Sequence, residues 1–208
     1  VPGGGIWLNT QRPEWNDANN ALAGGGLSVV TLAHLRRYLS FLAEVLAPHR
    51  GEALPVSGDV VQWLADVTGA LTDERGLLDG PDLADTDRRR VLDALGEAFS
   101  RYREAVYAAG LSAAQDLPVD RVLELCVVAR DWVDHALRAS RREDGLLHSY
   151  NLLQIQGDHG AAVARLPLML EGQVAALGSG ALSAAESLTL LERLFASDLY
   201  DPDRRSFT

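Results

Sequence analysis

The chain has 208 residues, of which 47% are hydrophobic and 23% charged, so it has the composition of a globular protein that can bury a core. Its formal net charge of −10 disfavours nucleic acid and anionic membrane surfaces as partners. No apolar run approaches the roughly 20 residues that a membrane-spanning helix needs. The single cysteine, Cys126, excludes an intrachain disulfide and favours a reducing, cytoplasmic compartment.

Helical periodicity dominates the first half of the chain. An apolar stripe follows Gly24-Gly25-Gly26 and predicts a helix that stops before Pro48. A second helix is predicted after Ser57, and a third from about Thr86 to Gly110, a residue type that favours helix ends. The run of arginines at 88–90 has acidic neighbours and is interpreted as a solvated helix face.

Three more helices are predicted in the second half. The fourth begins near Pro118 and the fifth near Pro167, because proline is tolerated in a first turn. The sixth begins at Ser183, which matches a capping box with Glu186. Its leucines at 188, 191 and 194 are expected to face the core.

The predicted fold class is therefore all-α. No alternating strand pattern of useful length is present, and residues 141–160 are interpreted as a long irregular stretch. Short breaks between helices favour antiparallel neighbours, which gives about three helical hairpins in succession.

Residues 11–20, Gln-Arg-Pro-Glu-Trp-Asn-Asp-Ala-Asn-Asn, are dense in hydrogen-bonding side chains. Asp17 has two interpretations. It could be a turn or cap residue that organises the start of the first helix. It could also be a general acid, since aromatic walls such as Trp7 and Trp15 would raise the pKa of a carboxyl group by desolvating its charged form. Glu14 is interpreted as a surface or loop-ordering group.

A second polar group occupies residues 142–151. Its carboxylates Glu143 and Asp144, together with His148 and Tyr150, resemble the lining of a polyol-binding site, although a solvated turn would have the same composition. Near the start of the fifth predicted helix, Glu171 and Gln173 add a carboxylate and an amide. A glutamine amide can donate to and accept from a sugar hydroxyl, but a glutamine on a helix surface is the commoner case. The histidines have no metal-binding spacing, and no P-loop is present, so no metal or cofactor is expected.

At Trp15-Asn16-Asp17-Ala18-Asn19-Asn20 the chain resembles the cellobiose and chitobiose phosphorylase family of inverting glycoside phosphorylases. That family carries Trp-Asn-Asp-Gly-Met-Asn at its general acid, followed by a glycine-rich connection and Gly-x-Ser-Val at the start of a helix. Here Gly26-Leu27-Ser28-Val29 follows in the matching place. Residues 170–180 are similar to the family's Gln-Ser-Trp-Ala helix that ends in Ser-Gly. Ala18 and Asn19 depart from the pattern, and no residues here are assigned to the Thr-Gly pair with which the family holds phosphate.

The resemblance implies a fold and a site. The family's catalytic domain is an (α/α)6 toroid of twelve helices, so about six helices in residues 1–208 would form half of that domain, in a fragment of a longer chain. The missing parts of the chain, or a second copy of it, would cover the exposed apolar flank. Asp17 would be the general acid, an oligosaccharide or disaccharide the substrate, and inorganic phosphate a co-substrate. The substrate-binding residues would be Trp15, Asn16, Asn20, Gln173, His148 and Tyr150.

Two alternatives stay open. An inverting hydrolase of the same fold would need a second carboxylate, roughly 6.5–9.5 Å from the acid, to activate water. The candidates for that base are Glu143, Asp144 and Glu171. The other alternative is a relative without turnover, either a carbohydrate-binding protein or a helical scaffold in which Asp17 is only a cap.

Overall fold

The computed structural model describes residues 1–8, 22, 24–157 and 159–207. Within these residues lie six α-helices, α2 (Val29–Leu46), α3 (Gly58–Asp73), α4 (Asp85–Ala109), α5 (Val119–Ala139), α6 (Leu170–Gly178) and α7 (Ala184–Phe195). Short 3-10 helices follow α2 at Ala47–His49 and α3 at Arg75–Asp79.

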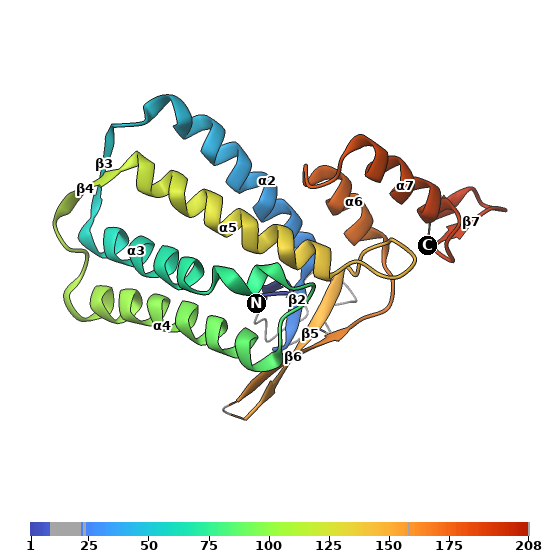
Figure 1. Cartoon of the computed structure of the whole chain (residues 1–208), viewed down its shortest axis with the longest axis horizontal. Helices are drawn as coiled ribbons and strands as arrows, with labels where there is room; N and C mark the ends of the chain where they lie inside the picture. The colour runs from blue at the N-terminus through green and yellow to red at the C-terminus, as the bar shows by residue number, and fades with distance from the viewer. Residues whose placement is uncertain (9–21, 23, 158, 208) are drawn as a thin grey trace.

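The described residues also form three antiparallel sheets (Figure 1). The largest has the order β1 (Ile6–Trp7), β2 (Gly26–Ser28), β5 (Tyr150–Gln156) and β6 (Gly160–Arg165). The two smaller sheets pair β3 (Ala53–Ser57) with β4 (Ala114–Pro118), and β7 (Tyr200–Asp201) with β8 (Ser206–Phe207). The fold is therefore mixed, with helices and sheets, and the prediction of an all-α half toroid is wrong.

The helices do not follow one another as three hairpins. Helix α2 packs on α5, and α3 packs on both α4 and α5, so α5 lies between α2 and α3 in the helical layer (Figure 1). The β3–β4 pair joins the ends of this layer, because β3 leads from α2 into α3 and β4 leads from α4 into α5. Helices that are distant in the sequence thus become neighbours, which the assumption of short antiparallel breaks did not predict.

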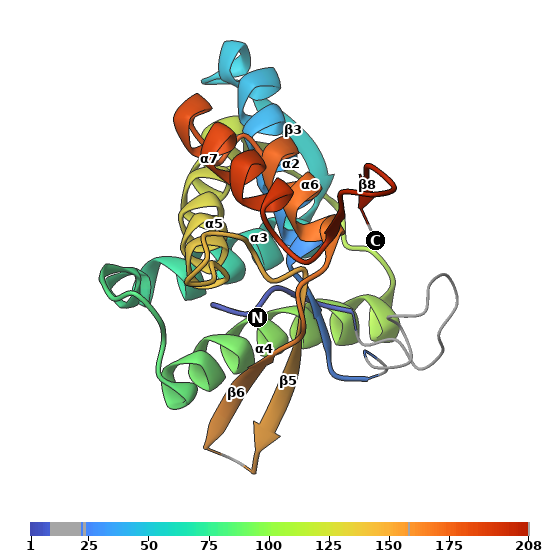
Figure 2. The same ribbon diagram turned by 90° about the vertical axis from the view of Figure 1, so that its right-hand side faces the viewer.

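The strands were not predicted because their sequences lack a strict alternation of apolar and polar residues. Strand β5 reads Tyr-Asn-Leu-Leu-Gln-Ile-Gln, and half of the residues of β6 are alanine, a residue with low β-propensity. Pairing between the two strands from Asn151↔Arg165 to Gln156↔Gly160 supplies the stabilisation that local propensity does not. Figure 2 shows the far ends of this hairpin projecting beyond the helices.

The main core cluster joins α2, α5, α6 and α7. Cys126 is buried within it, as expected for a small apolar side chain. On α7 the predicted orientation is partly wrong, because Leu190 and Leu194 enter the core, whereas Leu188 and Leu191 are 58% and 38% exposed. The capping box of Ser183 with Glu186 is confirmed.

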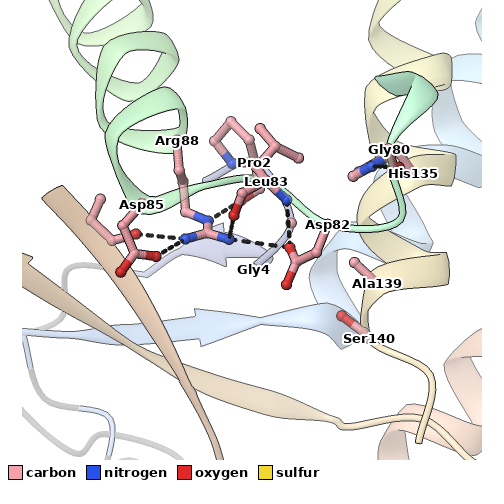
Figure 3. Close-up of polar contacts among 12 residues, drawn as sticks. Pro2, Gly4, Gly80, Asp82, Leu83, Asp85, Arg88, His135, Ala139 and Ser140 are labelled. Carbon is pink, nitrogen blue, oxygen red and sulfur yellow. Dashed lines mark hydrogen bonds and ion pairs between the residues drawn. The ribbon is translucent and has the colours of Figure 1, made fainter. Parts of the chain in front are cut away.

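Arg88 on α4 is buried, so the interpretation of residues 88–90 as a solvated face is wrong for this arginine. Its guanidinium donates to the carbonyl oxygens of Pro2 (2.9 Å), Leu83 (2.8 Å) and Ala161 (2.8 Å) and forms ion pairs with Asp82 and Asp85 (Figure 3). It ties α4 to the N-terminal segment and to β6. No helix among the described residues is long and apolar enough to cross a bilayer.

Candidate functional site

Of the two-part motif predicted from the sequence, the structure describes the second part, Gly26 to Val29, and not the first. Asp17, Trp15, Asn16, Asn20 and Glu14 lie outside the residues that the structure describes. Immediately before and after them, Leu8 N donates to Gly26 O (2.9 Å) and the indole Nε1 of Trp7 donates to Gly24 O (2.8 Å). The β1–β2 pairing therefore places Trp7 and Leu8, which precede these residues in the chain, beside Gly24 and Gly26, which follow them.

The second half of the same motif lies at a strand-to-helix junction. Ser28 ends β2 and caps α2, since its Oγ accepts from the backbone N–H of Thr31 at 2.9 Å. The next residue, Val29, donates its backbone N–H to Ser149 O (3.0 Å), and Ser28 is paired with Tyr150 across β2 and β5. The structure thus brings the first motif and the second polar group together through their backbones.

Tyr150 pairs with Ser28, the last residue of β2, and His148 lies two residues before Tyr150 in the chain. Trp7 and Leu8 are joined instead to Leu27 and Gly26, the other two residues of β2. Tyr150 is buried. Nδ1 of His148 lies 2.9 Å from Leu166 O, and because a carbonyl oxygen only accepts, Nδ1 carries the proton and Nε2 is the basic atom. Burial lowers the pKa of His148 below its usual value of 6.5, despite the favourable bond to Leu166. His148 is therefore a neutral acceptor at neutral pH, which suits it to a ligand hydroxyl.

The loop before β5 also contains two of the three candidate bases, Glu143 and Asp144. Asp144 pairs with Arg142 (2.8 Å) and accepts from Leu146 N (3.0 Å), and the bond from Arg142 holds the pKa of its carboxyl below the usual range. A carboxylate with a lowered pKa stays ionised but is a weaker base. Glu143 is exposed on the same loop.

The loop is fastened to α6 by Gln173. This side chain is buried, its Oε1 accepts from Leu147 N (2.9 Å), and its Nε2 donates to Leu147 O (2.6 Å) and Met169 O (3.0 Å). Both amide hydrogens are therefore used, and Gln173 positions the loop. Glu171 is exposed in the first turn of α6, where the helix dipole favours a carboxylate.

Ser149 makes a second attachment that the sequence did not suggest. Its hydroxyl accepts from Gly172 N (2.8 Å) and donates to Met169 O (3.0 Å). A Cβ atom on Gly172 would lie 2.5 Å from this hydroxyl oxygen, so the contact requires glycine there. Arg165 was also missed, although it is the one basic residue in an alanine-rich strand. It donates to Ala139 O (2.8 Å), at the base of the loop.

A pocket of about 400 Å³ lies between the end of α5, this loop, α6 and the start of α7. It has two carboxylates, two guanidinium groups and an apolar floor, and it is lined by Asp134, Leu137, Arg138, Arg141, Leu147, Ala176, Ser179, Ala181, Leu182 and Glu186. Bonds from Ser183 and Arg141 lower the pKa of Glu186 to about 2, so it is ionised at neutral pH and accepts hydrogen bonds without acting as an acid. Of the predicted site residues that the structure describes, none lines this pocket, but Gln173 holds Leu147 in its wall.

Within the described ranges, no group of three or more His, Cys, Asp or Glu side chains could hold a metal ion. No protein-family model matches the chain, and no curated protein matches it significantly.

Proposed function

We propose that this chain belongs to a carbohydrate-active enzyme that cleaves or forms glycosidic bonds by phosphorolysis, with Asp17 as the general acid. The observation that carries the proposal is the motif in two parts, Trp15-Asn16-Asp17-Ala18-Asn19-Asn20 and then Gly26-Leu27-Ser28-Val29, at the spacing of inverting glycoside phosphorylases. The proposal rests on this motif and not on the toroid of that family, which the fold does not have.

Two features of the described residues support the proposal. Ser28 caps α2, so the second part of the motif begins a helix, as Gly-x-Ser-Val does in the family. The pocket next to Leu147 offers the carboxylate acceptors of Asp134 and Glu186 beside apolar side chains, the combination that binds a sugar ring.

The proposed reaction needs one proton donor. Inorganic phosphate attacks the anomeric carbon from the face opposite the leaving sugar, and the carboxyl group of Asp17 gives its proton to the departing oxygen. Phosphate is nucleophilic without a general base, and its negative charge raises the pKa of a neighbouring acid. The products are a sugar 1-phosphate of inverted configuration and a shortened acceptor.

Hydrolysis is the second candidate, and one observation favours it: the one Thr-Gly pair of the sequence, Thr68-Gly69, lies inside α3, where the Thr68 hydroxyl donates to Leu64 O and is not free to hold phosphate as the family's pair does. Water would then need a base, and the candidates are Glu143, Asp144 and Glu171. Glu143 and Glu171 are exposed, whereas Asp144 is held by Arg142, which lowers the pKa of its carboxyl and so weakens it as a base.

Turnover by the full-length protein tests the proposal. β-linked disaccharides of glucose and of N-acetylglucosamine would be incubated with and without inorganic phosphate, and the products followed by NMR. Phosphorolysis predicts an α-sugar 1-phosphate that forms only with phosphate. Free sugar formed at equal rates in both arms would establish hydrolysis instead. No turnover and no disaccharide binding would reject the carbohydrate assignment.

A further inference from the structure

A groove of about 780 Å³ runs along the junction of α2 and α5, next to the pocket described above, with which it shares Ser179. The α2 wall extends from Arg36 to Ala47, which is about 16 Å at 1.5 Å per helical residue. The α5 wall is formed by Leu123, Val127 and Arg130, and residues 178–180 after α6 also line the groove.

The groove is cationic, although the chain as a whole is acidic. Four arginines line it, Arg36, Arg37, Arg50 and Arg130, against one acid, Glu44. Arg36 pairs with Asp134 and Arg50 with Asp120, but no described residue forms an ion pair with Arg37 or Arg130. Two guanidinium groups are therefore available to a carboxylate from outside the chain.

Apolar side chains in the same groove also lack cover. Phe41 is 59% exposed and Val127 is 45% exposed, and both line the groove. Arginines beside an aromatic ring and an aliphatic side chain form the typical composition of a protein interface. Such a groove fits an amphipathic helix that carries a carboxylate.

Helix α7 of this chain has the complementary surface. Leu188, Leu191 and Phe195 are 38–58% exposed, and their spacing places them on one face of the helix, next to the face that buries Leu190 and Leu194. The ring of Phe195 also packs against Tyr200 and Phe207. Glu192 is exposed beside this face and forms no ion pair with a described residue. With 12 residues α7 is about 18 Å long, close to the length of the groove.

We propose that the groove receives α7 of a second copy of this chain. The exposed leucines and Phe195 would cover Phe41 and Val127, while Glu192 would pair with Arg130 or Arg37 of the other protomer. Residue 180 lines the groove and α7 begins at Ala184, so the two surfaces are close neighbours in the chain. In a pair related by a two-fold axis, each copy can therefore place its α7 in the groove of the other, and such an assembly closes as a dimer.

Sedimentation of the full-length protein over a range of concentrations tests this proposal. The wild type should be a dimer, and Arg130→Glu or Glu192→Arg should each weaken it by about tenfold or more. The double variant, Arg130→Glu with Glu192→Arg, should recover most of the affinity because the charges are exchanged. Arg103→Glu is the matched control, since this exposed arginine on α4 lies outside the groove.

A monomer at all concentrations would overturn the proposal, and so would a dimer that neither substitution weakens. Circular dichroism of each variant separates lost association from lost folding. If Arg130→Glu does not fold, Glu192→Arg alone decides, because this residue is exposed on the other side of the proposed contact.

Discussion

The amide of Gln173 binds both backbone groups of Leu147, accepting from its N–H at 2.9 Å and donating to its carbonyl oxygen at 2.6 Å. This two-point contact joins α6 to the loop that carries Asp144 and His148. The sequence suggested Gln173 as a sugar ligand. In the described arrangement it holds the loop next to the candidate site in position.

Gln173→Leu should destabilise the protein by about 2–4 kcal/mol, because it leaves the buried N–H and carbonyl groups of Leu147 without their partner. Urea denaturation measures this loss. Val174→Ala is the control, since Val174 is exposed on the same helix and should change the free energy of unfolding by less than about 0.5 kcal/mol. A Gln173→Leu variant of unchanged stability with a raised KM would contradict the positioning role and favour direct substrate binding.

Gly172→Ala should destabilise the protein by about 1–3 kcal/mol, because the new methyl group would meet Ser149 Oγ at 2.5 Å and Ser149 Cα at 2.9 Å. Gly178→Ala, in the same helix, meets nothing within 4 Å and should be neutral or slightly stabilising. Thermal unfolding of the two variants compares the sites directly. Equal melting temperatures would show that α6 does not pack against Ser149 as described.

Arg88→Ala should cost about 3–5 kcal/mol, because it leaves three carbonyl oxygens and two carboxylates without their buried partner. Arg89→Ala should cost no more than about 1 kcal/mol, since its ion pair with Asp93 is near the surface. Chemical denaturation of both variants provides the measurement. Similar losses for the two arginines would contradict the buried network.

His148 should make stability depend on pH. Its pKa is lowered by folding, so the unfolded chain binds the proton more tightly. The contribution of His148 is fully present above the unfolded value of about 6.5 and is lost as the pH falls from there through the lower folded pKa. His148→Gln should remove this part of the pH dependence, measured as the difference between two profiles of unfolding free energy. Identical slopes below pH 6.5 would contradict the lowered pKa.

The features that sequence patterns predicted are local ones. The capping box at Ser183 and the helix stop at Gly110, which has a φ of +76°, depend on residues within one turn. On α7, by contrast, the three- and four-residue spacing of leucines allows two stripes, and only packing decides that Leu190 and Leu194 enter the core.

The remaining errors concern contacts between distant segments. Arg88 is buried because carbonyl groups from Pro2 and Ala161 converge on it, which its acidic neighbours in the sequence could not indicate. Strand β6 exists because β5 pairs with it, and its alanines carry no strand signal of their own. For the site, the sequence grouped residues 142–151 and Gln173 as separate candidates, and the bonds between Gln173 and Leu147 join them.

The most direct test of the proposed function is the turnover of the full-length Asp17→Asn variant. Asparagine caps and turns about as well as aspartate, so folding should change little, but the transferable proton is lost. On an unactivated disaccharide the rate should fall roughly 10²–10⁴-fold, and the loss should shrink on a glycosyl fluoride, whose leaving group needs no protonation. Glu14→Gln, in the same polar segment, is the matched control and should retain activity. Near wild-type turnover of Asp17→Asn on the unactivated disaccharide would contradict the account.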